Sequence, residues 1–125
     1  MFQLDFKSGV PICDQIVNGF IKLKALGVLK RGDQLPSVRA LASKFSVNPN
    51  TVQKSYAILE ANGIIYSVKG KGSFISDDET AANAVLQSAR QEFIAAVCHA
   101  VDLGLSTDEM INLVKQNSAK EEKSL

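Results

Sequence analysis

The chain has 125 residues, of which 46% are hydrophobic and 22% charged, so it has room for one small domain with an appendage and can form a core. This composition excludes wholesale disorder, and the apolar runs are too short for a helix that spans a bilayer. The formal net charge of +1 hides an uneven distribution: residues 1–76 carry ten basic and four acidic side chains, whereas residues 77–125 carry four and nine. This asymmetry is typical of a protein whose first part meets a polyanion, although ordinary solvated faces also produce it.

The N-terminus has no basic segment followed by an apolar one, so a cytoplasmic protein is expected. In a reducing compartment Cys13 and Cys98 are expected to be free thiols, buried or half-buried, that serve only packing. Two cysteines and one histidine, His99, make a poor structural zinc site, so the sequence predicts no metal and no cofactor. His99 falls on the polar arc of its predicted helix and is expected at the surface.

The first predicted element is a helix over residues 11–27. Its apolar residues recur at spacings of three and four and form one stripe, and Gly27 is suited to end it. The stretch 31–36 is predicted to be a loop, because glycine and proline interrupt it. The residues of the helix stripe are Ile12, Ile16, Phe20 and Leu23, widened by Val17 and Ile21.

Two shorter helices are predicted next, joined by a tight connection. Ser37 is suited to cap a helix that runs to about Phe45. Asn48 is a favoured N-cap and Pro49 fits the first helical position, so a third helix is predicted over residues 49–62. Its inward face comprises Val52, Tyr56 and Leu59, so Tyr56 is interpreted as a core residue rather than a stacking platform for bases.

A hairpin follows the three helices. The β-like runs 64–68 and 73–75 flank Lys69-Gly70-Lys71-Gly72, which would place two lysines and two glycines at the tip. By itself this tip is also an ordinary turn, and it lacks the ending of a phosphate-binding loop. Two short helices with a tight turn and a basic hairpin describe a winged helix-turn-helix over residues 1–76.

Residues 77–125 are predicted to form a short helical dimerisation domain. A long helix would run from residues 77–79 to about Gly104, with an apolar arc too wide for a single neighbour. Ser106 would cap a last helix, and the charged tail from Ser118 is expected to fray. Two helices enclose no roomy pocket, but they can bury an apolar seam against a second copy. The candidate dimer contacts are Leu86, Ala89, Phe93, Ala96, Val97 and Ala100.

The third helix carries the chemistry of duplex recognition. Asn50 and Gln53 lie opposite its core face, and both side chains can form paired hydrogen bonds to an adenine edge in the major groove. Lys54 could reach a phosphate or a guanine, Thr51 could donate to a phosphate, and Arg39 would lie at the rim of the groove. Solvated polar residues on an exposed face would give the same pattern. The candidate DNA contacts are Ser37, Arg39, Asn48, Asn50, Thr51, Gln53, Lys54, Lys69, Gly70, Lys71 and Gly72.

The segment from about Pro11 to Ser76 resembles the DNA-binding domain of the GntR family of bacterial transcription regulators. The resemblance implies that Arg39, Asn50 and Thr51 contact DNA and that Gly70 and Gly72 belong to the wing. The matching residues are Pro11-Ile12, Gln15-Ile16, Gly32 to Arg39, Leu41-Ala42, Val47 to Lys54, Tyr56, Leu59-Glu60, Gly63 and Gly70 to Phe74.

The Asn-Pro-Asn-Thr-Val-Gln-Lys run and the short C-terminal part are similar to the YtrA branch of that family. This similarity implies homodimers on palindromic operators in double-stranded DNA, and repression of an operon such as one that encodes an ABC transporter. Many family members have arginines where this chain has Pro49 and Gln53, so base preference cannot be copied from other branches.

Three further possibilities stay open at this point. The winged helix could be a protein-interaction module without DNA binding, since fold does not determine function. An enzyme is poorly supported, because the sequence contains no nucleophile–base motif and a single histidine. The wide apolar arc of the long helix also motivates the hypothesis of a small-molecule effector at the dimer interface or between the domains.

Overall fold

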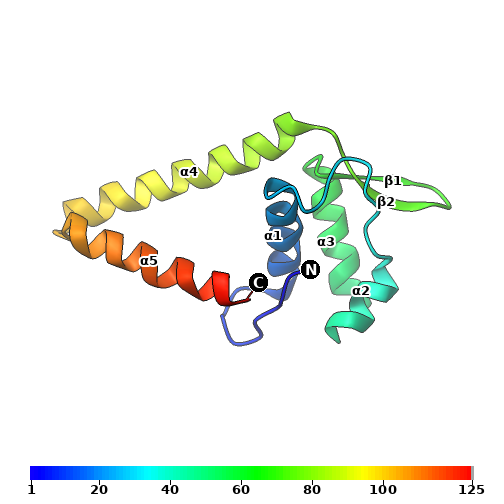
Figure 1. Cartoon of the computed structure of the whole chain (residues 1–125), viewed down its shortest axis with the longest axis horizontal. Coiled ribbons are helices and arrows are strands. Elements are labelled where there is room, and N and C mark those ends of the chain that lie inside the picture. The colour runs from blue at the N-terminus through cyan, green and yellow to red at the C-terminus, as the bar shows by residue number, and fades with distance from the viewer. Residues whose placement is uncertain (125) are drawn as a thin grey trace. The chain divides into compact units, whose positions relative to one another are not determined.

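The computed structural model describes the backbone of residues 1–124 and the side chains of residues 1–80 and 83–118 (Figure 1). Two compact units make up the chain, one over Gln3–Ala82 and one that holds α4 from Asn83 onward together with α5. The predicted fold class, mostly helical with one small hairpin, is confirmed. The elements are α1 (Ile12–Ala25), α2 (Val38–Phe45), α3 (Pro49–Ala61), β1 (Ile65–Val68), β2 (Gly72–Ile75), α4 (Glu79–Asp102) and α5 (Thr107–Ser124).

In the first unit α3 is the central element, and it packs against α1, α2 and β1. Each helix turns one apolar stripe toward the shared core, as its spacing of three and four residues predicts. The hairpin closes the core with residues at the base of its strands. The buried apolar side chains include Ile16, Phe20, Leu23, Leu35, Leu41, Val52, Tyr56, Leu59, Ile64 and Ile75.

The helix caps form as predicted. The Ser37 hydroxyl accepts a hydrogen bond of 3.1 Å from the Ala40 N–H at the start of α2. The Asn48 Oδ1 accepts one of 2.8 Å from the Asn50 N–H at the start of α3. Each bond satisfies a donor that has no partner within the helix. Between the two helices Ser46 adopts the left-handed conformation with φ of 55°, which keeps the connection tight.

The hairpin differs from the prediction at its tip. Val68 pairs with Gly72, so Gly72 is the first residue of β2 and the tip comprises Lys69, Gly70 and Lys71 only. The Lys71 N–H donates to the Val68 carbonyl over 2.9 Å and closes this turn. Across the strands, the rings of Tyr66 and Phe74 stack with centroids 5.6 Å apart.

Residues 31–36 form no helix or named strand, as predicted, but their backbone is held by hydrogen bonds to the hairpin. This backbone pairs with β2: the N–H groups of Gly32 and Leu35 donate to the Ile75 and Ser73 carbonyls, each over 2.8 Å. The Ile75 N–H in turn donates to the Asp33 carbonyl over 2.8 Å. Residues 32–35 therefore pair with β2 through these hydrogen bonds and one isolated bridge between Gln34 and Phe74, a pairing that local sequence signals do not indicate.

In the second unit α4 and α5 meet at a turn where Gly104 has φ of 100°, and they diverge from it (Figure 1). The Ser106 hydroxyl caps α5 by accepting a hydrogen bond from the Glu109 N–H. The fraying expected from Ser118 is wrong, because α5 continues to Ser124. Cys98 is exposed rather than buried, because most of α4 is itself exposed in one chain. Among the described residues, no helix is both long and apolar enough to cross a membrane.

Candidate nucleic-acid interface

The first turns of α3 present amide side chains outward and apolar side chains inward. Asn50, Gln53 and Lys54 are exposed, whereas Val52 and Tyr56 are buried. In the described part of the chain, no hydrogen bond engages the side-chain amides of Asn50 or Gln53. Their donors and acceptors are therefore available for a ligand such as a base edge.

The side chains of two other candidate residues at the start of α3 are less available to a ligand. Thr51 is half-buried, and its carbonyl accepts a hydrogen bond of 2.9 Å from the Ser55 hydroxyl. The Asn48 side chain is already engaged as the N-cap. Its NH₂ group can still donate outward while its oxygen caps the helix. Asn48 is thus both the start of α3 and a possible donor at its exposed end.

Two side-chain contacts link α3 to its neighbours. The Tyr56 hydroxyl donates to the Pro36 carbonyl over 2.7 Å and ties α3 to the segment before α2. The buried Ser55 hydroxyl lies 3.1 Å from the carbonyl oxygen of Cys13 in α1. Cys13 itself is half-buried and free, as predicted. These contacts hold the inner face of α3 against α1 and against the segment that leads into α2.

The Tyr56 phenol is enclosed by the core. Its ring meets that of Phe20 edge to face, with centroids 5.8 Å apart and an interplanar angle of 78°. Burial raises the pKa of this phenol well above its ordinary value, because the phenolate would lose its hydration. Tyr56 is a core residue, as predicted, and not a surface for stacked bases.

Arg39 and Ser37 occupy the first turn and the cap of α2. The Arg39 side chain is exposed, and the Ser37 hydroxyl accepts from the Ala40 N–H. In Figure 1, α1 lies on one side of α3 while α2 and the hairpin extend on the other. In that view α2 and the hairpin therefore lie on the same side of α3.

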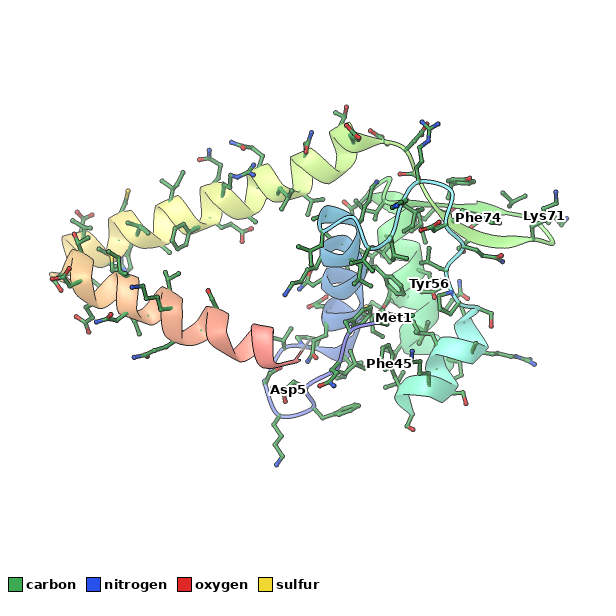
Figure 2. The ribbon with its side chains drawn as sticks, in the orientation of Figure 1. Met1, Asp5, Phe45, Tyr56, Lys71 and Phe74 are labelled. Atoms are coloured by element: carbon green, nitrogen blue, oxygen red, sulfur yellow. The ribbon has the colours of Figure 1, made fainter. Side chains whose placement is uncertain are left out.

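The hairpin carries its lysines at the far end from the helices. Lys69, Gly70 and Lys71 are exposed, and Figure 2 shows Lys71 at the tip. Gly70 has φ of 78°, a conformation that side chains with a Cβ rarely adopt, so glycine suits the turn. A turn with two exposed ammonium groups is suited to contact phosphates.

The segment from residue 34 to residue 76 is predominantly basic. From residue 34 to residue 76 the only acidic side chain is Glu60, near the end of α3, where the Ser67 hydroxyl donates to it over 3.3 Å. The basic side chains of the same segment are Arg39, Lys44, Lys54, Lys69 and Lys71. These five basic side chains, on α2, α3 and the hairpin, outnumber the one acidic side chain, so the segment as a whole attracts polyanions.

The candidate dimer contacts belong to α4, in the second unit. Leu86, Val97 and Ala100 are half-buried, whereas Ala89, Phe93 and Ala96 are exposed. His99 is exposed, as predicted. The apolar arc of α4 is thus only partly covered within one chain.

Local sequence signals do not indicate one side-chain contact at the hairpin. The Gln34 Nε2 donates a hydrogen bond of 2.8 Å to the carbonyl oxygen of Lys71. The two residues are 37 positions apart. Neither periodicity nor a motif could indicate it, since it depends on the backbone pairing of residues 32–35 with β2.

Comparison with known proteins identifies the family. The model of the bacterial regulatory proteins of the gntR family matches residues 24–75. The HTH-type transcriptional repressor YtrA of Bacillus subtilis is 35% identical over 121 residues, which cover 95% of this chain and 93% of the repressor.

Two solved structures are similar over most of the chain. One is the crystal structure of a transcriptional antiterminator from Listeria monocytogenes, whose sequence is 37% identical to this chain. Its TM-score is 0.77, and the match covers 94% of this chain and 90% of the antiterminator chain. The GntR-family transcription factor YtrA from Sulfolobus acidocaldarius is 35% identical, with a TM-score of 0.58 over 72% and 97%. These relatives are transcription regulators, not enzymes. The chain belongs to the GntR family, in its YtrA branch, and is a DNA-binding transcription regulator.

Proposed function

We propose that this chain is a homodimeric repressor that binds a palindromic operator through α3 and the hairpin. The observation that carries the proposal is the exposed, unengaged pair Asn50 and Gln53 at the start of α3, on a segment with a single acidic residue. The first turns of α3 would enter the major groove, which admits one α-helix. Residues 1–76 would form the DNA-binding domain and residues 77–125 the dimerisation domain.

Each contact has a distinct role in this arrangement. Asn50 and Gln53 would read base edges, since each amide can form two hydrogen bonds to adenine. The remaining candidates on α2 and α3 and at their caps would contact phosphates or a guanine edge; they are Ser37, Arg39, Asn48, Thr51 and Lys54. Lys69 and Lys71, with Gly70 and Gly72, would lie against the DNA backbone as the wing. Phosphate contacts position the protein, and base contacts specify the sequence.

Exposed apolar side chains on the second unit support the dimer. Phe93 is 56% exposed, Val101 54% and Leu103 72% on α4 and its end, and Ile111, Leu113 and Val114 are exposed on α5. So many apolar side chains on two helices indicate a protein partner. A second copy is the commonest partner and buries the same surface on both chains. The two recognition helices would then lie about 34 Å apart, one helical turn of DNA.

Repression follows if the operator overlaps a promoter, because the bound dimer then excludes RNA polymerase. The name of the similar Bacillus protein supports this sign of regulation. An operon that encodes an ABC transporter is the target that the family resemblance implies. A protein that acts on a bacterial chromosome does so in the cytoplasm.

The test is selection of binding sites from a library of random duplex DNA by the full chain. Recovered sites should share a motif of two inverted half-sites, and affinity for them should fall steeply as salt rises. Arg39→Ala should weaken binding by about 1–3 kcal/mol. Arg90→Ala is the matched control, because Arg90 is exposed on α4 and its side chain donates a hydrogen bond to Gln87 on the same helix.

Three outcomes would contradict the proposal. Recovery of no shared motif would favour the protein-interaction module over the repressor. A motif with a single half-site, bound by one chain, would contradict the dimer. Equal affinities of Arg39→Ala and Arg90→Ala would show that Arg39 does not contact DNA.

A further inference from the structure

The hairpin tip is held by a residue outside the hairpin. Gln34 lies in the segment that pairs with β2, opposite Phe74. From there its side chain reaches the tip, where Nε2 donates to the Lys71 carbonyl over 2.8 Å. The tip has only three residues between the paired Val68 and Gly72. One side-chain bond therefore fixes the orientation of the peptide that follows the second tip lysine.

Gly72 makes room for this contact. Its φ of 122° lies in a region that L side chains rarely adopt, and a Cβ there would lie 2.8 Å from the Gln34 Nε2. A Cβ contact under 3.0 Å forces one of the two groups to move. Because Gly72 has no Cβ, the Gln34 amide has room to pass it and reach the tip.

We propose that Gln34 is a positioning residue for the wing, holding the Lys71 peptide so that Lys69 and Lys71 meet the DNA backbone in a fixed geometry. The inference rests on the proposed DNA binding and adds a residue that contacts the wing instead of the DNA. The Gln34–Lys71 bond is exposed, and exposed hydrogen bonds contribute little to fold stability. Its effect should therefore lie in the ordering of the tip before DNA arrives.

The experiment compares Gln34→Ala and Gln34→Met with wild type on a selected operator, measuring affinity at several salt concentrations and the thermal midpoint of unfolding. Both variants remove the donor, and methionine preserves the length of the side chain. Each should bind about three- to tenfold more weakly, the range for the cost of ordering one side chain on binding. The plot of log affinity against log salt should become less steep by about 0.9 for each lost lysine–phosphate contact. The thermal midpoint should not change.

A double-mutant cycle separates positioning from direct contact. In a Lys69→Ala/Lys71→Ala background, Gln34→Ala should cause no further loss, because the wing has no charges left to position. Gln91→Ala, an exposed glutamine on α4, is the matched control and should bind like wild type.

The outcomes are distinguishable from failure of the proposed function. If wild type selects no DNA, the proposed function fails. If wild type binds and both Gln34 variants keep its affinity and salt slope, only the positioning inference is overturned. A further loss in the lysine-free background would mean that Gln34 contacts DNA itself. A fall in thermal midpoint in both variants, with an unchanged salt slope, would assign Gln34 to the fold instead of the wing.

Discussion

The hydroxyl of Tyr56 donates a hydrogen bond of 2.7 Å to the carbonyl oxygen of Pro36 and so joins the centre of α3 to the segment that leads into α2. The same ring packs edge to face on Phe20 of α1. One side chain therefore links α3 to two other parts of the first unit, α1 and the segment before α2. Tyr56 therefore anchors the helix that also carries the exposed Asn50 and Gln53.

Tyr56→Phe should destabilise the fold. The change keeps the ring packing on Phe20 but leaves the Pro36 carbonyl without its donor, at a cost of about 1–2 kcal/mol. The measurement is the free energy of unfolding in urea. Tyr66→Phe is the control, because Tyr66 is 44% exposed on the hairpin and its ring stacking is kept. Equal losses in both variants would contradict a specific role for the Tyr56 hydroxyl.

The same phenol predicts a loss of stability in alkali. Burial raises the pKa of Tyr56 above its ordinary value of 10.0, so the folded chain holds this proton more tightly than the unfolded chain does. Its contribution is therefore complete below pH 10 and is lost as pH rises further. Unfolding of wild type and Tyr56→Phe between about pH 8 and pH 11 should show their stability difference shrinking as pH rises. A difference that stays constant across this range would contradict the prediction.

Asn48 allows capping and DNA binding to be separated. Asn48→Ala removes the acceptor for the Asn50 N–H and should cost about 0.5–2 kcal/mol of stability. Asn48→Asp keeps an acceptor and suits the helix N-terminus, so stability should be retained. Its carboxylate would nevertheless repel nearby phosphates, so operator affinity should fall. Unfolding in urea and binding titrations on the two variants measure both quantities. Undiminished affinity of Asn48→Asp would place Asn48 away from the DNA.

Phe93→Glu should weaken the proposed dimer. Burial of a phenylalanine side chain contributes about 1.5–3 kcal/mol, and a carboxylate in an apolar interface adds a further cost. The monomer–dimer dissociation constant should rise at least about tenfold, as measured by sedimentation equilibrium. Gln91→Glu adds the same charge to an exposed position on α4 and should leave the constant unchanged. A Phe93→Glu protein that dimerises like wild type would show that this part of α4 is not the interface.

Much of the fold could be predicted because its signals are local. Ser37 and Asn48-Pro49 mark helix starts through hydrogen bonds to residues two or three positions away. The apolar spacing of α1 and α3 indicates which side chains turn inward, and Ile16, Phe20, Val52 and Leu59 are buried accordingly. The faces of α3 follow from the same periodicity, which is why the outward Asn50 and Gln53 could be identified in advance.

Tertiary structure alone decided the details of the wing and of α4. The pairing of β1 with β2 includes Gly72 in a strand, and the pairing of residues 32–35 with β2 brings Gln34 to Lys71, 37 residues away. Likewise the exposure of Cys98 follows from how little of α4 is covered within one chain. The sequence by itself determined the helices, their caps and their inward faces, because these depend on neighbours within one or two turns. Contacts between residues far apart in the sequence form only when the packed core brings their backbones together. No local sequence pattern indicates which distant segments will meet.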